Sequence, residues 1–340
     1  MTPPGSATHQ RPATASLLKR LYTGTGAFNI IGRKRLFFTI TAILLVISLS
    51  GIIFRGFTFG IDFTGGTRVE LPAAHISPDE AERVFSESSG VSPATVQVVG
   101  TGAASSIQIR SESLDEGQIR AVELAFHTSL NESSDTSAQH QVSVSAVSET
   151  WGGRVTEKAV LALAVFLVLV FAYISLRFEW HMALAAIAAV IVDLAVTSGV
   201  YALVGFEVSP ATVIGLLTIM GYSLYDTVVV FDKIQENTRN VAKQTKHTYA
   251  ELANLGVNQT LMRSINTSLT SALPIISLLL VAVWMLGVGT LKDLALVQLV
   301  GVVVGTYSSP FFAAPLLVYM KERAEEIKTH TMKVMEARSA

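Results

Sequence analysis

Two aspartates lie inside long apolar runs of this sequence. Asp226 lies in the run 210–231, and Asp193 lies in the run 182–204. A carboxylate inside a segment long enough to cross a membrane is costly, so it usually marks an ion pathway, a proton relay or a buried pair. We interpret Asp226 as a proton-titrating carboxylate, with a static packing contact as the alternative. For Asp193, a second station of a proton path and a helix-packing contact are equally favoured.

Arg263 is the predicted partner of Asp226. It precedes the apolar run 268–285, which would be antiparallel to the run that holds Asp226, so both side chains are expected in one layer of the membrane. A guanidinium keeps its proton, so it would hold the ionised carboxylate and release it on protonation. The alternative is an arginine that extends to the lipid headgroups. Close to the aspartate, Gly221 and Ser223 predict a close approach of a neighbouring helix.

A glycine-rich segment follows the first apolar run. Gly60, Gly65 and Gly66 permit tight backbone paths in which bulkier residues would clash. We predict that these glycines couple the first membrane span to the region that follows it. Asp62, which lies between them, is interpreted as a turn-forming residue.

Two further charged residues lie at the ends of apolar runs. Arg177 lies beside Phe178 and Trp180 in a short turn, which predicts an interfacial anchor built from a charge and aromatic rings. Asp232 ends the run that contains Asp226. It is predicted to lie at the membrane interface rather than in a proton relay.

The composition places the chain in a membrane. The 340 residues are 50% hydrophobic and only 15% charged, which is too apolar for an ordinary soluble protein. The formal net charge of −1 provides no basic field for nucleic acid. Because the sequence contains no cysteine, disulfides and cysteine metal sites are excluded. Residues 1–35 lack the pattern of a cleavable signal peptide, so the first span is expected to be an uncleaved anchor.

Six apolar runs are long enough to cross a bilayer, which takes about 20 residues of helix. These runs are residues 36–54, 159–176, 182–204, 210–231, 268–285 and 294–319. Pro310 and Pro315 predict a kink or an early end in the last run. Lys and Arg gather in the tails 1–35 and 320–340 and between the fourth and fifth runs, so both termini are predicted to be cytoplasmic.

Residues 55–157 are predicted to form a small extracytoplasmic domain between the first and second spans. Strands and helices are expected at 67–71, 77–89, 95–99, 106–110, 113–130 and 141–147. The two helices are predicted to begin with capping boxes, Ser77 with Glu80 and Ser113 with Glu116. This order, strand–helix–strand–strand–helix–strand, favours a ferredoxin-like α+β fold.

The predicted extracytoplasmic domain shows no pattern that indicates catalysis. His75, His127 and His140 lack the paired spacing of a metal site, and no nucleophile elbow, phosphate loop or carboxylate pair occurs. We therefore expect a binding or mechanical domain, without enzyme activity, cofactor or metal. The polar segments 1–18 and 131–139 are predicted to be disordered or mobile.

Five segments of the chain, in order, resemble the SecD/SecF family of preprotein translocase subunits, within the wider resistance–nodulation–division transporters. They are Gly60–Gly66, Arg177–Trp180, Gly221–Asn237, Asn258–Ser268 and Tyr307–Pro310. The resemblance covers nearly the whole chain. The short region 55–157 is similar to that of the SecF branch, because SecD carries a much larger one.

The resemblance implies a function in protein export. A SecF-like chain would form one half of a SecD–SecF unit in the bacterial cytoplasmic membrane, associated with the SecYEG channel. The unit is expected to use the proton-motive force to promote export and insertion of unfolded preproteins, with SecA, YajC and YidC as further partners. The family's membrane aspartate and arginine correspond to Asp226 and Arg263, and Asp193 falls at a commonly acidic position.

The chain departs from the family pattern at three positions. Tyr225 stands where Asn usually precedes the aspartate, and its hydroxyl would still be able to bond to a carboxylate. Lys233 and Gln235 stand where two Arg are usual, which weakens any bidentate contact there.

Two other functions are consistent with the sequence. One is half of a proton-driven exporter of small solutes, although six spans are half of the usual twelve for that class. The other is a scaffold of the translocon that uses no proton energy, in which Asp226 would be purely structural.

Overall fold

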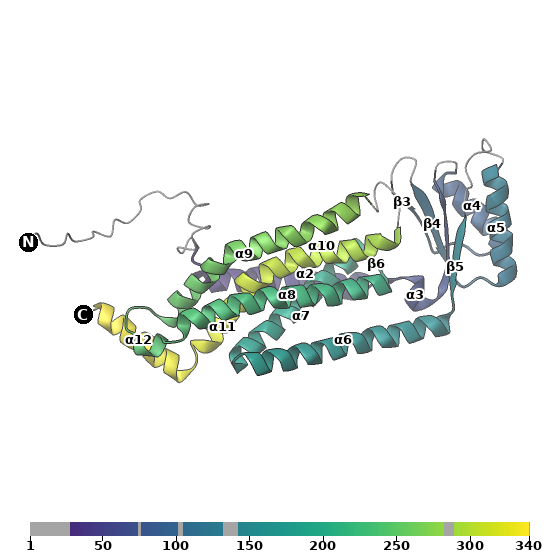
Figure 1. Cartoon of the computed structure of the whole chain (residues 1–340). Coiled ribbons are helices and arrows are strands. Elements are labelled where there is room, and N and C mark those ends of the chain that lie inside the picture. The colour runs from purple at the N-terminus through teal and green to yellow at the C-terminus, as the bar shows by residue number, and fades with distance from the viewer. Residues whose placement is uncertain (1–27, 74–75, 101–104, 132–141, 282–288, 340) are drawn as a thin grey trace, which may run out of the picture.

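The computed structural model describes residues 28–73, 76–100, 105–131, 142–281 and 289–339. Within these residues the chain forms a long helical bundle with an α/β domain at one end (Figure 1). We call this end of the bundle the domain end, and the opposite end, where the last helix lies, the distal end. His75, His140 and the polar segments 1–18 and 132–139 lie outside the described residues.

Six helices of the described chain are long and apolar enough to cross a membrane. They are α2 (Lys34–Arg55), α6 (Glu149–Arg177), α7 (Trp180–Val204), α8 (Pro210–Thr238), α9 (Tyr249–Leu278) and α10 (Gly289–Ser308), which continues as a helical segment to Lys321. A short 3-10 turn, η1 (Ile31–Arg33), precedes α2. The chain is therefore a polytopic helical membrane protein.

Two of these helices begin well before the predicted membrane spans. α6 begins at Glu149 and α9 at Tyr249, whereas the apolar runs begin at 159 and 268. An apolar run detects only the part of a helix that lies in hydrocarbon, while the helix itself starts where its first amides find partners. For α9 those partners come from a reciprocal capping box between Thr248 and Glu251.

The last span contains a π-helical turn. α10 passes into this turn at Ser309–Ala313, followed by α11 (Ala314–Lys321) and the polar helix α12 (Glu325–Ser339). Pro310 has no amide proton and cannot complete the regular hydrogen-bond ladder, and a π turn accommodates the gap. Pro315 lies in the first turn of α11, where its missing amide proton is tolerated. The kink predicted in this span is a widened turn, not an end.

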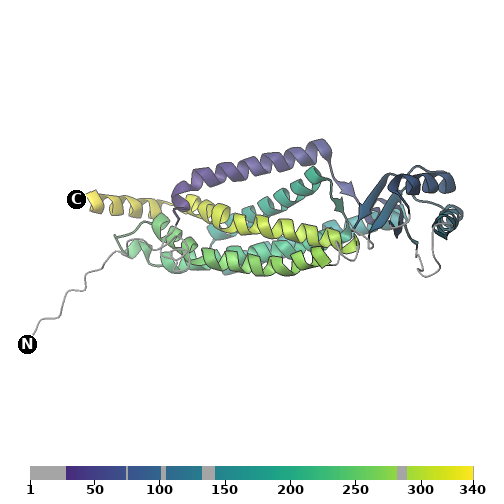
Figure 2. The same ribbon diagram turned by 90° about the horizontal axis from the view of Figure 1, so that it is seen from above.

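α8 lies at the centre of the bundle. It packs against α7, α9 and α10, and α2 packs against α7. Figure 1 shows α6 along one edge of the bundle, and Figure 2, seen from above, shows α2 along another. In their most apolar windows, 56% of α7 is buried but only 11% of α6 and of α9. The helices at the edge thus expose apolar surface of the kind that lipid or a second membrane protein covers.

The α/β domain (residues 66–147) contains the predicted strands and helices in the predicted order. Its elements are β2 (Gly66–Pro72), α4 (Pro78–Ser89), β3 (Thr95–Val99), β4 (Ser106–Ser111), α5 (Glu116–Asn131) and β5 (Ser143–Val147). The strand order is β3-β4-β2-β5, and every neighbouring pair is antiparallel. Phe85 of α4 and Phe126 of α5 are fully buried against Val69 and Ile109, so both helices cover the same face of the sheet.

The predicted cap of α5 was wrong by two residues. Asp115, rather than Ser113, precedes the helix: its carboxylate accepts from the amide of Gln118 at 2.8 Å, and the Gln118 side chain accepts from the Asp115 amide at 3.0 Å. The same box spacing thus occurs twice in this segment. Burial of Leu114 in the domain core favours the capping box that begins at Asp115. A helix that began at Ser113 would turn the Leu114 side chain away from the core.

Candidate functional site

Asp226 lies inside the bundle, at the contact between α8 and α9. Its side chain is 5% exposed, and its Oδ1 atom accepts a hydrogen bond from the Ser264 hydroxyl at 2.6 Å. Its Oδ2 atom is buried and has no partner in the described structure. Asp226 comes 16 positions after Pro210, about 24 Å along the helix from the domain end.

Arg263 precedes Ser264, the hydrogen-bond partner of Asp226, but its side chain points out of the bundle. It donates to the hydroxyl of Tyr225 at 3.0 Å, and Arg263 and Tyr225 are both exposed. In the described chain no ion pair within 4.0 Å joins Arg263 to Asp226, so the predicted direct pair does not form in this structure. The reason is geometric: adjacent helical residues differ by about 100°, so Ser264 faces inward while Arg263 faces outward.

The Tyr225 hydroxyl, which could have bonded to the carboxylate, does not do so in this structure. It instead accepts from the guanidinium of Arg263, because it lies one position before Asp226 and faces the outside of the bundle. The two adjacent pairs, Tyr225 with Arg263 and Asp226 with Ser264, hold α8 and α9 together at one level. The outer pair places a fixed positive charge beside the buried carboxylate.

Asp193 of α7 contacts the same helix. It is 2% exposed, accepts a hydrogen bond from the Ser223 hydroxyl and has a buried Oδ1 atom without a partner in the described residues. Ser223 precedes Asp226 by three positions, so the two side chains share a face of α8. The structure therefore brings the two predicted carboxylates to the same central helix, at neighbouring levels.

Hydroxyl groups link these carboxylates to the π-helical turn of the last span. The hydroxyl of Ser309 lies 2.9 Å from that of Thr227 and also donates to the carbonyl of Ser223 at 3.4 Å. One turn away, the hydroxyls of Tyr222 and Thr306 both donate to Ser268, at 3.1 and 2.6 Å. A hydroxyl can donate and accept, so such a cluster can pass protons or adjust when a carboxylate changes charge. π turns occur frequently at functional sites.

The close helix approach predicted at Gly221 occurs elsewhere. A Cβ atom at Gly221 would meet nothing within 4 Å, so this glycine faces open space and the prediction was wrong for it. A Cβ at Gly215 would lie 2.3 Å from Val297, and one at Gly301 would lie 2.4 Å from Ile219. α8 and α10 are therefore in close contact through these glycines. Ser223 does belong to this interface, since a Cβ at Gly305 would lie 3.0 Å from its Cβ.

The glycine-rich segment forms the joint between the bundle and the α/β domain. After α3 (Ile61–Thr64), Gly65 and Gly66 have φ values of 79° and 129°, which favour glycine. A Cβ at Gly65 would lie 2.9 Å from the backbone of Glu149, and one at Gly66 would lie 2.6 Å from the Ser111 carbonyl. Asp62 lies in the first turn of α3.

A two-stranded parallel sheet adds a second connection at this joint. β1 (Thr58–Phe59) pairs with β6 (Glu207–Val208), which lies in the short loop between α7 and α8. The Gly60 amide continues the pairing, since it donates to the carbonyl of Val208 at 2.8 Å. The segment before the glycines is therefore fixed to the helices that carry Asp193 and Asp226.

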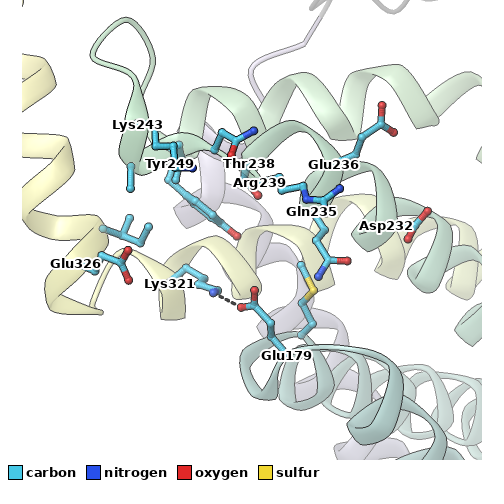
Figure 3. A pocket seen from close by; sticks show the side chains of 15 residues that line it. Glu179, Asp232, Gln235, Glu236, Thr238, Arg239, Lys243, Tyr249, Lys321 and Glu326 are labelled. Carbon is cyan, nitrogen blue, oxygen red and sulfur yellow. Dashed lines mark hydrogen bonds and ion pairs between the residues drawn. The ribbon is translucent and has the colours of Figure 1, made fainter.

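The remaining predicted residues lie at the distal end. Arg177 and Asp232 come together at 3.9 Å, with both side chains exposed, as interfacial residues do. A cavity of about 770 Å³ opens beside them between α7, α8, α9 and α12, and Asp232 lines it (Figure 3). Figure 3 shows Lys321 paired with Glu179 across this cavity. Its lining carries both charge signs and includes neither of the buried aspartates.

Residues before α2 are fixed to the start of α9, which the sequence did not predict. The Asn258 side chain accepts from the Phe28 amide at 2.9 Å and donates to the Phe28 carbonyl at 2.8 Å. Asn254 accepts from the amides of Ile30 and Ile31 at 2.9 and 3.1 Å. Apart from Ser223, the residues whose hydroxyl groups surround the carboxylates were also missed. The only signal for them was the frequency of Ser and Thr in otherwise apolar helices.

The described residues contain no group of three or more His, Asp or Glu side chains that could hold a metal ion. An ionised carboxylate with an unpartnered oxygen in an apolar interior is costly, and uptake of a proton removes that charge. Asp193 and Asp226 both meet this description.

Comparison with known proteins identifies the family. Residues 127–323 match the family described as protein export membrane protein SecD/SecF, C-terminal, and residues 50–74 match the SecD/SecF GG motif. The chain belongs to the SecD/SecF family of protein-export membrane proteins.

Within this family the chain groups with the SecF subunits of the protein translocase. It is 54% identical to the protein translocase subunit SecF of Mycobacterium tuberculosis over 327 residues, which cover 96% of this chain and 74% of that protein. It is 39% identical to SecF of Streptomyces coelicolor, with 94% and 84% of the two chains covered. The chain is thus a transmembrane protein of the Sec pathway of protein translocation.

A solved structure supports the same assignment. The crystal structure of SecDF from Thermus thermophilus, a translocon-associated membrane protein, aligns with a TM-score of 0.74 and 34% sequence identity. A structure of SecDF in a super-membrane-facing form aligns with a TM-score of 0.60. The first alignment covers 87% of this chain but only 39% of the SecDF chain. The chain therefore corresponds to about two fifths of that longer protein.

Proposed function

We propose that the chain is the SecF half of a SecD–SecF unit. The unit would use the proton-motive force to promote preprotein export across, and insertion into, the bacterial cytoplasmic membrane. The observation that carries the proposal is Asp226, a carboxylate inside a membrane span with one hydroxyl partner and one buried, unpartnered oxygen. Such a group alters its charge and its contacts when it binds or releases a proton.

The proposed mechanism uses the two levels of contact between α8 and α9. When Asp226 is ionised, the Ser264 hydroxyl and the nearby Arg263 charge both favour the contact between the helices. When Asp226 is protonated, the attraction to the guanidinium is lost and the carboxyl becomes a hydrogen-bond donor. The helices then favour a different arrangement. Asp193, which is bonded to Ser223, provides a second carboxylate that can bind the proton.

A polar stripe on α9 supports SecD as the membrane partner. Gln259, Arg263, Asn266 and Thr270 follow one another at intervals of four, three and four residues, so they share one face of the helix, and all four are exposed. A charged and polar face within a membrane span is costly against lipid, so a second membrane segment is expected to cover it.

A cross-linking experiment tests this contact. Because the chain has no cysteine, Asn266→Cys introduces a single thiol into the stripe. We expect it to cross-link to SecD in native membranes. Leu169→Cys is the matched control, since it is exposed on α6, along the opposite edge of the bundle from α9 (Figure 1). Labelling of Asn266→Cys by lipid-phase reagents without any SecD adduct would contradict the assignment.

We also propose the orientation in the membrane. The α/β domain would be extracytoplasmic, with the tails 1–35 and 320–340 in the cytoplasm, spans at 36–54 and within 158–319, and the exported region at 55–157. Basic residues at the distal end, such as Arg239 and Lys243, support this orientation through the positive-inside rule. The element order and the strand order β3-β4-β2-β5 support a ferredoxin-like fold for the domain.

The proposed function is tested by translocation of a secreted preprotein into inverted membrane vesicles. Vesicles with and without the chain are compared, each with an intact proton gradient and with the gradient collapsed by an ionophore. We expect the gradient-dependent share of translocation to require the chain. Equal gradient dependence in vesicles that lack it would contradict proton coupling through this subunit. If removal of the chain reduces translocation equally with the gradient intact and with it collapsed, the result would favour the scaffold.

A further inference from the structure

Glu207 lies where the bundle meets the α/β domain. Its Oε1 atom accepts from Arg68 of β2 at 2.8 Å, and its Oε2 atom lies 3.4 Å from Arg110 of β4. The Glu207 and Arg110 side chains are each 12% exposed and that of Arg68 is 18% exposed, so the three charges are largely withdrawn from solvent. Ion pairs in such surroundings are screened much less than surface pairs.

The same carboxylate is fixed by the segment that leads into the α/β domain. Arg110 also donates to the carbonyl of Phe59 at 2.6 Å, and Phe59 pairs with Val208 in the β1–β6 sheet. A Cβ at Gly60 would lie 2.6 Å from the Glu207 Oε1 atom, so the first glycine of the glycine-rich segment leaves space for this carboxylate. Figure 1 shows β6 at the domain end of the bundle, next to α3.

Glu207 is directly connected to both helices of the carboxylate site. It lies three residues before Pro210, where α8 begins, and α8 carries Asp226. The loop that contains Glu207 also follows the end of α7 at Val204, and α7 carries Asp193. A movement of α7 against α8 therefore displaces Glu207, because helices transmit displacement along their axes.

The charge cluster has an alternative set of partners. Asp293 and Lys292, at the start of α10, line the same cavity of about 210 Å³ as Arg68 and Arg110. The Nε atoms of both arginines are buried without a partner, and Asp293 forms no ion pair within 4.0 Å in the described part of the chain. The two guanidiniums can thus exchange Glu207 for Asp293, and in either arrangement they pair with one of these two carboxylates. Transitions between two discrete packings of this kind amplify small shifts.

We propose that Glu207 is a positioning residue that transmits rearrangement of the Asp193 and Asp226 helices to the α/β domain through its ion pairs with Arg68 and Arg110. This inference rests on the proposed proton-coupled function. It adds the route by which a change of charge within the membrane moves the domain outside it.

The first measurement is the distance between the domain and the bundle. Nitroxide labels are placed at Arg120→Cys on α5 and Ile214→Cys on α8, both exposed positions of a chain that otherwise lacks cysteine. Asp226→Asn mimics the protonated carboxyl and is expected to shift the distance distribution when Glu207 is present. We expect no shift when Asp226→Asn is combined with Glu207→Gln. A shift of equal size in both backgrounds, or none in either, would overturn the inference.

The second measurement is gradient-dependent translocation, at equal membrane abundance of each variant. Glu207→Gln is expected to reduce the gradient-dependent share at least fivefold, on the scale of an intersite coupling of about 1 kcal/mol. Glu70→Gln is the matched control: this carboxylate lies on the same strand as Arg68 and accepts a hydrogen bond from Ser106 within the domain at 3.0 Å. Its gradient-dependent share is expected to be unchanged.

A charge exchange separates coupling from simple loss of folding. Glu207→Arg combined with Arg68→Glu again places one carboxylate between two cations, and we expect it to restore more than half of the gradient-dependent share. If the double variant shows no larger gradient-dependent share of translocation than Glu207→Arg alone, the inference is overturned. The proposed function is judged separately, by comparing the gradient dependence of translocation in vesicles with and without the native chain.

Discussion

Asp226→Asn is expected to abolish the gradient-dependent part of preprotein translocation while the protein still inserts into the membrane. Asparagine has nearly the same shape and keeps a carbonyl oxygen that can accept from Ser264, as the Asp226 Oδ1 atom does at 2.6 Å. The asparagine amide cannot bind or release a proton near neutral pH. Loss of a proton-transfer group typically reduces a rate by about 100-fold or more.

The side-chain environment sharpens this expectation. The unpartnered Oδ2 atom of Asp226 is buried, so an amide nitrogen at that position has no acceptor in the described structure. The nitrogen is expected to cost about 1–3 kcal/mol of stability if no group moves to meet it. Membrane abundance and detergent stability of the variant are therefore measured first, and translocation is compared at equal abundance.

Asp232→Asn is the matched control for this prediction. Asp232 lies six residues further along the same helix, with its side chain 62% exposed and 3.9 Å from Arg177. Exposed ion pairs contribute about 0–1 kcal/mol, so the control is expected to retain both stability and gradient-dependent translocation. Equal losses in the two variants would contradict a specific role for Asp226. Unchanged gradient dependence in Asp226→Asn would leave the scaffold as the better account.

Gly152→Ala is expected to destabilise the joint between the bundle and the α/β domain. Gly152 lies in the first turn of α6, and a Cβ there would lie 2.6 Å from the Phe63 carbonyl oxygen and 3.1 Å from the Gly65 amide nitrogen. Both atoms belong to the backbone of the glycine-rich segment, which cannot rotate away as a side chain can. Overpacking of this kind costs about 1–3 kcal/mol.

Gly153→Ala is the control that the chain itself provides. A Cβ at Gly153 would meet nothing within 4 Å, and the residue is exposed. Because alanine favours a helix over glycine by up to about 1 kcal/mol, this variant is expected to be neutral or slightly more stable. The midpoints of thermal unfolding in detergent are compared, together with the rate of proteolysis in the α/β domain. Equal midpoints for the two alanine variants would show that the tight contact is absent in solution.

Much of the architecture follows from properties that are local in the sequence. A run of about 20 apolar residues crosses a membrane wherever it occurs, and alternating or helical periodicity needs no knowledge of distant residues. For this reason the six membrane helices and the order of elements in the α/β domain were predicted correctly. Carboxylates inside apolar runs identified Asp193 and Asp226 as the residues to examine, and both are buried.

Only the tertiary structure decided which groups these residues contact. The sequence placed Arg263 in the same layer of the membrane as Asp226. The rotation of α9 about its axis turns Arg263 toward Tyr225 and Ser264 toward Asp226. Helix packing likewise made Gly215 and Gly301, not Gly221, the close contacts of α8. The ion pairs of Glu207 join residues that are far apart in the chain. Partner choice depends on the rotation of each helix about its axis and on the meeting of distant segments, and neither is encoded in a local pattern.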